Sequence, residues 1–187
     1  MIEGAPEFQP FPKVPRLNRG VVVTEKIDGT NAAIHVTEEG QVFAGSRNRW
    51  ITTKDDNHGF ARWVEEHAIE IAHGLGPGTH FGEWWGSGVQ RGYGLTKGEK
   101  RFSLFNTARW NHETPPPECC NVVPVLAVLA LFDTSTIRHL LAELEAAGSQ
   151  AAPGFMDPEG IVIYHAASRS LFKATLHGDE VPKGMAA

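Results

Sequence analysis

The sequence predicts an α+β domain that consists mainly of antiparallel sheets with a few flanking helices. Short runs of β-branched and aromatic residues are separated by glycine, proline, asparagine and aspartate, a pattern typical of strands joined by hairpins. Two segments alone carry apolar residues at helical spacing. The 187 residues, 41% of them hydrophobic and 21% charged, have the size of one domain with its own core. We therefore expect a single domain over residues 1–187.

The first half of the chain is expected to begin with an arm and continue into strands. Prolines at four positions of residues 1–20 disfavour a helix and predict an extended arm that wraps the domain. Strands are then expected at Val21 to Ile27, Ala32 to Thr37 and Gln41 to Gly45, and together they read as an antiparallel meander.

Two helices and five further strands complete the predicted fold. Apolar residues at helical spacing from Phe60 to Ile71 predict a helix that ends at Gly74, and a second helix is expected at Ser135 to Ala147. The glycine-rich residues 86–98 between two strands are expected to form a mobile flap. The remaining strands are expected at Thr79 to Trp85, Arg101 to Asn106, Val122 to Leu131, Glu159 to Tyr164 and Ser170 to Leu176.

The composition excludes several classes of protein. Lys and Arg total 17 and Asp and Glu total 22, so the net charge is -5, which argues against a protein that coats nucleic acid through a large basic surface. A local basic cleft stays compatible with this charge. No signal peptide is visible, and the longest apolar run, Val122 to Phe132, is too short to span a membrane. Adjacent Cys119 and Cys120 cannot join distant segments by a disulfide. We expect a cytoplasmic protein.

The segment Thr24-Glu25-Lys26-Ile27-Asp28-Gly29-Thr30-Asn31 places a lysine at the end of an apolar strand. An ordinary lysine, with a pKa of about 10.4, is protonated at neutral pH and cannot attack an electrophile. A rigid strand, partial burial and neighbouring cations would allow this lysine to act as a nucleophile. Asp28-Gly29 is also a strong hairpin signal, and in that interpretation Lys26 is merely exposed.

A lysine that attacks phosphorus needs carboxylates for a divalent cation, a cation for the phosphate, a polar group for ribose and an aromatic face for a base. The sequence offers a candidate for each role near the end of a predicted strand. Of these, Arg47 could equally be a surface arginine, and Phe105 could belong to the core. The candidates are Arg47, Glu83, Phe105, Glu159 and Lys173.

Five short motifs in fixed order resemble those of the covalent nucleotidyltransferases, which comprise ATP-dependent RNA and DNA ligases and mRNA capping enzymes. The resemblance covers nearly the whole chain and implies the adenylation domain of that superfamily. Thr30-Asn31 after the first motif is most similar to the RNA ligase branch. The motifs are Lys26-Ile27-Asp28-Gly29, Gly82-Glu83, Phe102 to Asn106, Glu159-Gly160-Ile161-Val162 and Phe172-Lys173.

The resemblance implies a reaction in three steps, in which Lys26 attacks the α-phosphate of ATP, AMP passes to an RNA 5′-phosphate, and a 3′-hydroxyl seals the strand. It also implies that Glu83 contacts ribose, Phe105 stacks on adenine and Arg47 reaches ribose or phosphate. Lys173 would bind the α-phosphate, and Glu159 would help to hold Mg²⁺ or Mn²⁺. Three further residues are assigned to the site: Asp28, to orient the lysine or hold metal-bound water; Asn31, as a donor to phosphate oxygens; and Glu25, in nucleotide binding.

The chain departs from the family pattern in two respects. The fifth motif usually carries two lysines, whereas here Lys173 stands alone, and Arg16, Arg91 and Lys183 are candidates to supply the second cation. No appended OB or helical domain is expected after the motif, which favours a minimal RNA ligase or one helped by a separate protein that grips RNA. The alternatives are a DNA ligase-like enzyme, a GTP-dependent capping-type enzyme, and a nucleotide-binding module without sealing activity.

Overall fold

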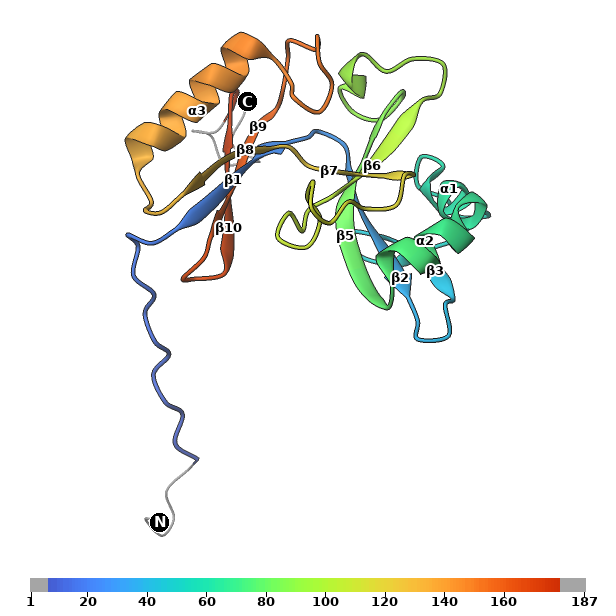
Figure 1. Cartoon of the computed structure of the whole chain (residues 1–187), viewed down its shortest axis with the longest axis horizontal. Coiled ribbons are helices and arrows are strands. Elements are labelled where there is room, and N and C mark those ends of the chain that lie inside the picture. Colours follow the sequence, from blue (N-terminus) through green and yellow to red (C-terminus); the bar gives the residue numbers. More distant parts are fainter. Residues whose placement is uncertain (1–6, 179–187) are drawn as a thin grey trace.

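The computed structural model describes residues 7–178 and contains two sheets with helices on their outer faces (Figure 1). The small sheet has the strand order β10-β9-β1-β8, and the large sheet has the order β4-β3-β2-β5-β6-β7. All strand pairs are antiparallel except the parallel pair of β6 and β7. The predicted α+β class with mainly antiparallel sheets is confirmed.

The small sheet joins the start of the described fold to its end. Its strands are β1 (Val21–Lys26), β8 (Val125–Leu129), β9 (Gly160–His165) and β10 (Ser170–Thr175). Helix α3 (Thr134–Ala147) covers one face, and its Ile137 and Leu144 pack against Val21 and Val23 of β1. The carboxylate of Asp133 caps this helix by accepting from the Ser135 and Thr136 amides.

The large sheet is formed by a continuous stretch of chain. Its strands are β2 (Thr30–Val36), β3 (Val42–Ser46), β4 (Trp50–Ile51), β5 (Gly78–Gly86), β6 (Lys100–Leu104) and β7 (Cys120–Val122). Helices α1 (Phe60–Glu66) and α2 (Ala68–Leu75) cover one face, where Phe60 and Ile71 are fully buried with Ile34 and Phe102. Each sheet thus has one face packed under helices and one face left uncovered.

The predicted meander is wrong, because β1 and β2 belong to different sheets. Strand β1 pairs with β8 and β9, whereas β2 pairs with β3 and β5. The chain crosses from the small to the large sheet at residues 27–29, so Asp28-Gly29 is not a hairpin turn. The hairpin signal depends only on neighbouring residues. The nearer partner strand of β1 is β8, which pairs Thr24 with Val125 and Val21 with Leu129, far along the chain.

Other boundaries differ from expectation for local reasons. The predicted first helix is divided at His67, whose backbone (φ -107°, ψ 11°) leaves the helical region. The predicted strand at Val122 to Leu131 is interrupted at Pro124, which lacks an N–H donor for the sheet and instead accepts the Glu25 amide at 2.9 Å. Strand β4 was not predicted, because two residues carry no periodic signal.

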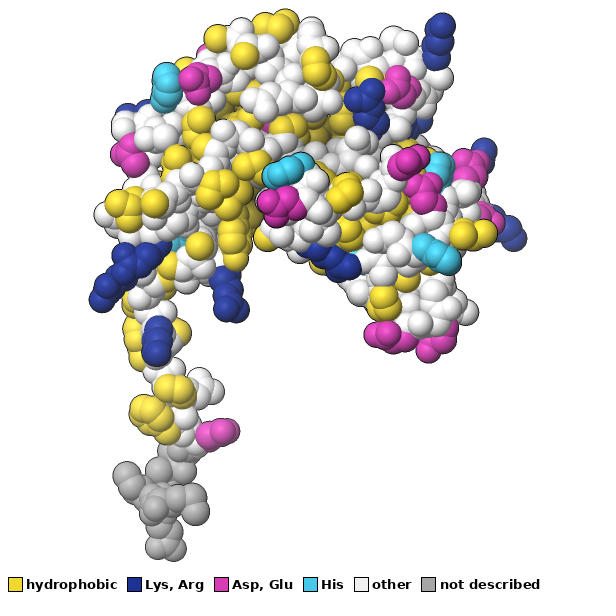
Figure 2. All heavy atoms as spheres, in the orientation of Figure 1, with side chains coloured by type: hydrophobic (Ala, Val, Ile, Leu, Met, Phe, Trp, Pro, Cys, Tyr) yellow, Lys and Arg dark blue, Asp and Glu magenta, His cyan; other side chains and the backbone are white. Residues whose placement is uncertain are grey.

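The arm does not wrap the domain. Its described residues extend away from the body, with hydrophobic and basic side chains along its length (Figures 1 and 2). Phe8 and Phe11 are 85% and 84% exposed. A hydrogen bond of 2.7 Å between His165 Nε2 and the Leu17 carbonyl oxygen attaches the base of the arm to β9. In the part of the chain from residue 7 to 178, no helix is long and apolar enough to cross a membrane.

Candidate functional site

A cleft of about 1010 Å³ lies between the uncovered faces of the two sheets. The space-filling view shows the molecule hollowed between its two lobes (Figure 2). Every residue that the sequence assigned to the nucleotide site borders this cleft, although the residues come from both sheets. They are Glu25, Lys26, Asp28, Asn31, Arg47, Glu83, Phe105, Glu159 and Lys173.

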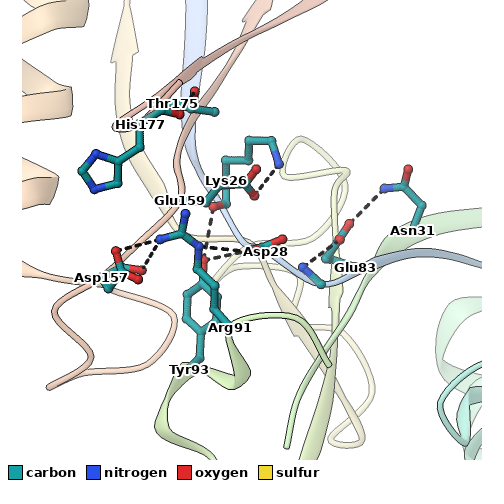
Figure 3. A network of polar contacts seen from close by, with 11 residues as sticks. Lys26, Asp28, Asn31, Glu83, Arg91, Tyr93, Asp157, Glu159, Thr175 and His177 are labelled. Carbon is teal, nitrogen blue, oxygen red and sulfur yellow. Dashed lines mark hydrogen bonds and ion pairs between the residues drawn. The ribbon is translucent and has the colours of Figure 1, made fainter. Parts of the chain in front are cut away.

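Lys26 is the last residue of β1, and its amine faces Glu159 across the cleft wall (Figure 3). Lys26 Nζ lies 2.5 Å from Glu159 Oε2, and the two side chains are only 24% and 18% exposed. Glu159 directly precedes Gly160, which pairs with Lys26 in the β1–β9 register. Gly160 has a φ of +152°, and an added Cβ would lie 2.2 Å from the Ala174 carbonyl oxygen. A glycine is therefore required where the two charged residues are brought together.

A chain of hydrogen bonds links the opposite wall to the turn that follows Lys26. Glu83 on β5 accepts from the Gly29 amide at 3.2 Å and from Asn31 Nδ2 at 2.9 Å. Arg47 Nε in turn donates to Asn31 Oδ1 at 2.9 Å. Burial raises the pKa of Glu83 to about 7, against the opposing effects of the Asn31 hydrogen bond and the Lys26 charge. Glu83 thus changes charge near neutral pH.

The glycine-rich loop also forms hydrogen bonds with the turn that follows Lys26, through Arg91 and Tyr93 (Figure 3). Arg91 Nε donates to Asp28 Oδ2 at 3.1 Å, and its guanidinium also lies 2.7 Å from Asp157 Oδ1. The Tyr93 hydroxyl accepts from the Asp28 amide at 2.9 Å and donates to the Lys26 carbonyl at 3.4 Å. We call Arg91 and Tyr93 the loop clip.

The loop clip anchors the middle of the loop that was expected to form a mobile flap at the mouth of the pocket. Tyr93 is 1% exposed and stacks on Phe155, with the ring centroids 4.6 Å apart, and it meets Trp85 edge-on. Burial raises the pKa of the Tyr93 hydroxyl, which therefore stays protonated and able to donate. Sequence reasoning missed this role, although a tyrosine among glycines was a visible signal that the loop is anchored.

Glu25 borders the cleft, but its carboxylate is engaged on the other side of β1. The residue is 1% exposed and accepts from Ser149 Oγ at 2.5 Å and from the Gln150 and Ala151 amides at 2.8 and 2.9 Å. These donors come from the loop that follows α3. Its carboxylate therefore anchors that loop, and a nucleotide contact through this group stays a prediction without geometric support.

The remaining predicted residues lie at the rim or on the wall of the cleft. Phe105 is 41% exposed, so the alternative that it is a core residue is wrong. Lys173 is on β10, opposite Val162 of β9. Of the candidates for a second cation, Arg91 is already bound to Asp28 and Asp157, and Lys183 lies outside the described residues.

The carboxylates of the cleft fit a cation that is shared with a nucleotide and do not form a complete metal cage. Within residues 7–178, no group of three or more His, Cys, Asp or Glu side chains is arranged to hold a metal ion. Magnesium commonly binds one or two carboxylates together with substrate phosphates. Glu159 suits this arrangement, whereas the Asp28 carboxylate already accepts from Arg91.

Comparisons with known proteins agree with this fold. An apo structure of an RNA ligase point mutant from Naegleria gruberi superposes with a TM-score of 0.61 at 19% sequence identity, covering 84% of this chain and 49% of that one. A mutant of Naegleria gruberi RNA ligase with AMP and manganese gives a TM-score of 0.57 at 20% identity, covering 85% and 50%. The same organism's RNA ligase with pyrophosphate gives 0.60 at 20% identity, covering 84% and 49%. The chain therefore spans about half the length of these structures.

A search among curated proteins gave no match. The family comparison matches RNA ligase over residues 19–175, which includes both sheets and every residue placed around the cleft. Because this match extends over most of the sequence and the fold agrees with it, the chain belongs to the RNA ligase family.

Proposed function

We propose that the protein is an ATP-dependent RNA ligase that forms a covalent lysyl-AMP at Lys26. The observation that carries the proposal is the position of the Lys26 amine, 2.5 Å from Glu159 in a cleft whose walls supply Glu83, Arg47 and Lys173. The structures of Naegleria gruberi RNA ligase mutants with ATP or AMP and manganese, and the match to the RNA ligase family, support this choice.

In the first step, the neutral amine of Lys26 attacks the α-phosphorus of ATP. A nitrogen–phosphorus bond forms, the bond from that phosphorus to the bridging oxygen breaks, and pyrophosphate leaves. The proton that the amine gives up passes to solvent, and Glu159 Oε2, 2.5 Å from Nζ, orients the amine. Lys173 on the same wall supplies positive charge for the α-phosphate, which carries additional charge while the bonds exchange.

In the second step, an oxygen of the RNA 5′-phosphate attacks the same phosphorus, and the nitrogen–phosphorus bond breaks to release Lys26 and give an RNA capped by AMP. In the third step, a 3′-hydroxyl attacks the 5′-phosphate of the strand, a phosphodiester forms, and AMP leaves. The resemblance in motifs supports these two steps.

Other side chains of the cleft are proposed to bind and orient the nucleotide. Phe105 at the rim offers an aromatic face to adenine, and Glu83 accepts from a ribose hydroxyl. Arg47 and Asn31 donate to ribose or phosphate. A divalent cation, Mg²⁺ or Mn²⁺, held by Glu159 and the nucleotide phosphates would neutralise phosphate charge. Asp28 is proposed to orient the Lys26 turn or to hold water bound to that cation.

The first test is the intact mass of the protein after incubation with ATP or GTP and Mg²⁺ or Mn²⁺. We expect one added AMP with ATP, and none with GTP. Lys26→Ala and Lys26→Arg should both lose the adduct, because arginine keeps the positive charge but is not a nucleophile. Lys54→Ala, which removes an exposed lysine of the β4 turn, should form the adduct as the unchanged protein does.

A second assay distinguishes the alternatives. Sealing of 5′-phosphorylated RNA with no sealing of nicked DNA would support the RNA ligase proposal. A GMP adduct would indicate a capping-type enzyme, and an AMP adduct without any sealing would indicate a module that lacks the later steps. Absence of an adduct with every nucleotide and cation would refute covalent catalysis at Lys26. The cytoplasmic location, the single-domain organisation and a separate protein that grips RNA stay predictions from the sequence.

A further inference from the structure

The uncovered face of the large sheet continues beyond the cleft as successive rows of side chains. The register places Asn31 opposite Glu83, and two residues further along β2 it places Ala33 opposite both Phe81 and Gly45. Side chains two residues apart on a strand point to the same face. The polar row that borders the cleft therefore adjoins, on one continuous surface, a row that contains Phe81.

Aromatic side chains occupy this second row and the next. Gly45 pairs with Trp50, and a Cβ added to Gly45 would lie 3.3 Å from two atoms of the Trp50 ring, so the indole lies over the glycine. In the following row, Phe43 pairs with His35. The Trp50 ring centroid is 6.2 Å from that of Phe43 and 6.0 Å from that of His35. We call Phe43, Trp50 and Phe81 the aromatic platform.

The aromatic platform is left in solvent although the rest of the sheet is well packed. Phe43, Trp50 and Phe81 are 46%, 59% and 60% exposed, whereas Trp84 and Phe102, which face the helices, are at most 2% exposed. Single exposed apolar residues are ordinary, but three large rings on one open sheet face indicate an interaction surface.

The position of the platform favours unpaired nucleic acid bases as its ligand. Phe105, the ring proposed to stack on adenine, donates its amide to the Phe81 carbonyl at 3.0 Å, so the nucleotide site and the platform adjoin on neighbouring strands. Arg47 lies where the cleft meets the platform, and acidic Glu38 and Glu39 lie beyond it in the β2–β3 turn. A phosphate backbone is thus attracted at the cleft end and repelled at the far end.

The net charge of the chain also favours binding through base stacking. With a net charge of -5, the chain has little capacity for sequence-independent binding through phosphate contacts. Base stacking on aromatic side chains is a source of affinity that does not depend on net charge, and it requires bases that are not paired. We propose that the aromatic platform binds unpaired bases of the RNA strand whose end is joined in the cleft. This inference rests on the proposed function.

The test is the binding of a short, 5′-phosphorylated, fluorophore-labelled single-stranded RNA, measured by fluorescence anisotropy, with the same sequence as a duplex for comparison. Trp50→Ala and Phe81→Ala should each raise the Kd for the single strand about tenfold, and Trp50→Phe should retain most of the affinity because it keeps a ring. Ile69→Ala, which removes an 81% exposed apolar residue of α2 on the opposite side of the sheet, is the matched control and should bind as the unchanged protein does.

The AMP adduct is measured on the same preparations, because its formation requires no RNA. Normal adduct formation together with weakened single-strand binding in Trp50→Ala and Phe81→Ala supports the platform. Equal affinity of these variants and the unchanged protein, or an equal loss in Ile69→Ala, overturns it. Tighter binding of the duplex than of the single strand also overturns it. Failure to form an adduct in the unchanged protein would refute the proposed function instead, so the two failures are distinguishable.

Discussion

At the residue scale, Glu83 gives the cleft a charge that depends on pH. Its pKa is raised from an ordinary value near 4.5 to about 7, mainly by burial. Between these values the folded protein holds a proton that the unfolded chain releases. The free energy of unfolding therefore falls as the pH rises from about 4.5 to about 7 and changes no further through this group above that range. The loss is about 3 kcal/mol.

Urea unfolding at several pH values between about 5 and 8 tests this behaviour. Glu83→Gln cannot ionise, so the stability of the unchanged protein should fall relative to this variant as the pH rises. Glu145→Gln, an exposed position on α3, should show no such divergence. Parallel pH profiles for the unchanged protein and Glu83→Gln would show that the Glu83 carboxyl titrates normally.

The residues of the cleft could largely be predicted from the sequence, because five short motifs in fixed order resemble those of the covalent nucleotidyltransferases. Glu25 borders the cleft as expected, but its carboxylate lies on the other side of β1. Adjacent residues in a strand point to opposite faces, so Glu25 and Lys26 could not both direct their side chains into one cleft. The alternation of β1, with buried Val21 and Val23, contained that information. The groups at residues 149–151 that donate hydrogen bonds to Glu25 could not be predicted, because no sequence pattern links this distant loop to Glu25.

At the scale of elements, the loop clip holds the turn that aims Lys26. Arg91→Ala would leave the Asp28 and Asp157 carboxylates without their shared cation, and Tyr93→Phe would leave the Asp28 amide without its acceptor. We expect each change to slow formation of the AMP adduct roughly tenfold, which corresponds to about 1.4 kcal/mol. Single-turnover adduct formation at saturating ATP measures this rate.

Arg138→Ala, on the exposed side of α3, serves as the control and should react at the unchanged rate. Adduct formation at an unchanged rate in both Arg91→Ala and Tyr93→Phe would show that the clip supports the fold without positioning the lysine.

Elements were predicted where the signal is local and long, and were missed where partners are distant. Helix α3 has an N-cap, a periodic face and a terminal glycine, and its observed bounds differ by one residue at the start. The pairing of β1 with β8 and β9 depends on contacts that no window of sequence contains. The two-residue strand β4 and the break at His67 depend on local geometry that propensity does not resolve.

At the scale of the whole molecule, the two sheets meet where the chain crosses between them. A Cβ added to Gly29 would lie 2.5 Å from the Trp84 carbonyl oxygen and 2.8 Å from the Trp85 Cβ. Gly29→Ala should therefore push the crossing segment away from β5 and lower the unfolding free energy by about 1–3 kcal/mol. It should also slow adduct formation, because the sheets carry opposite walls of the cleft. Chemical denaturation and the adduct assay measure the two effects.

Gly40→Ala separates these two effects. Gly40 has a φ of +80° and open space around it, so alanine there costs roughly 1 kcal/mol of backbone strain without touching the cleft. It should lower stability but leave the rate of adduct formation unchanged. Equal slowing of the reaction in both variants would mean that general destabilisation, and not the separation of the sheets, is responsible.

The order in which the sheets use the chain has a consequence for synthesis. All strands of the large sheet lie within residues 30–122, whereas β1 must wait for β8 and β9, which end at His165. As the chain leaves the ribosome, the large sheet has all its strands before any partner of β1 exists. Gly160, opposite Lys26, emerges only after every strand of the large sheet. The nascent protein therefore completes the cleft wall that carries Asn31 and Glu83 first and brings Lys26 beside Glu159 later.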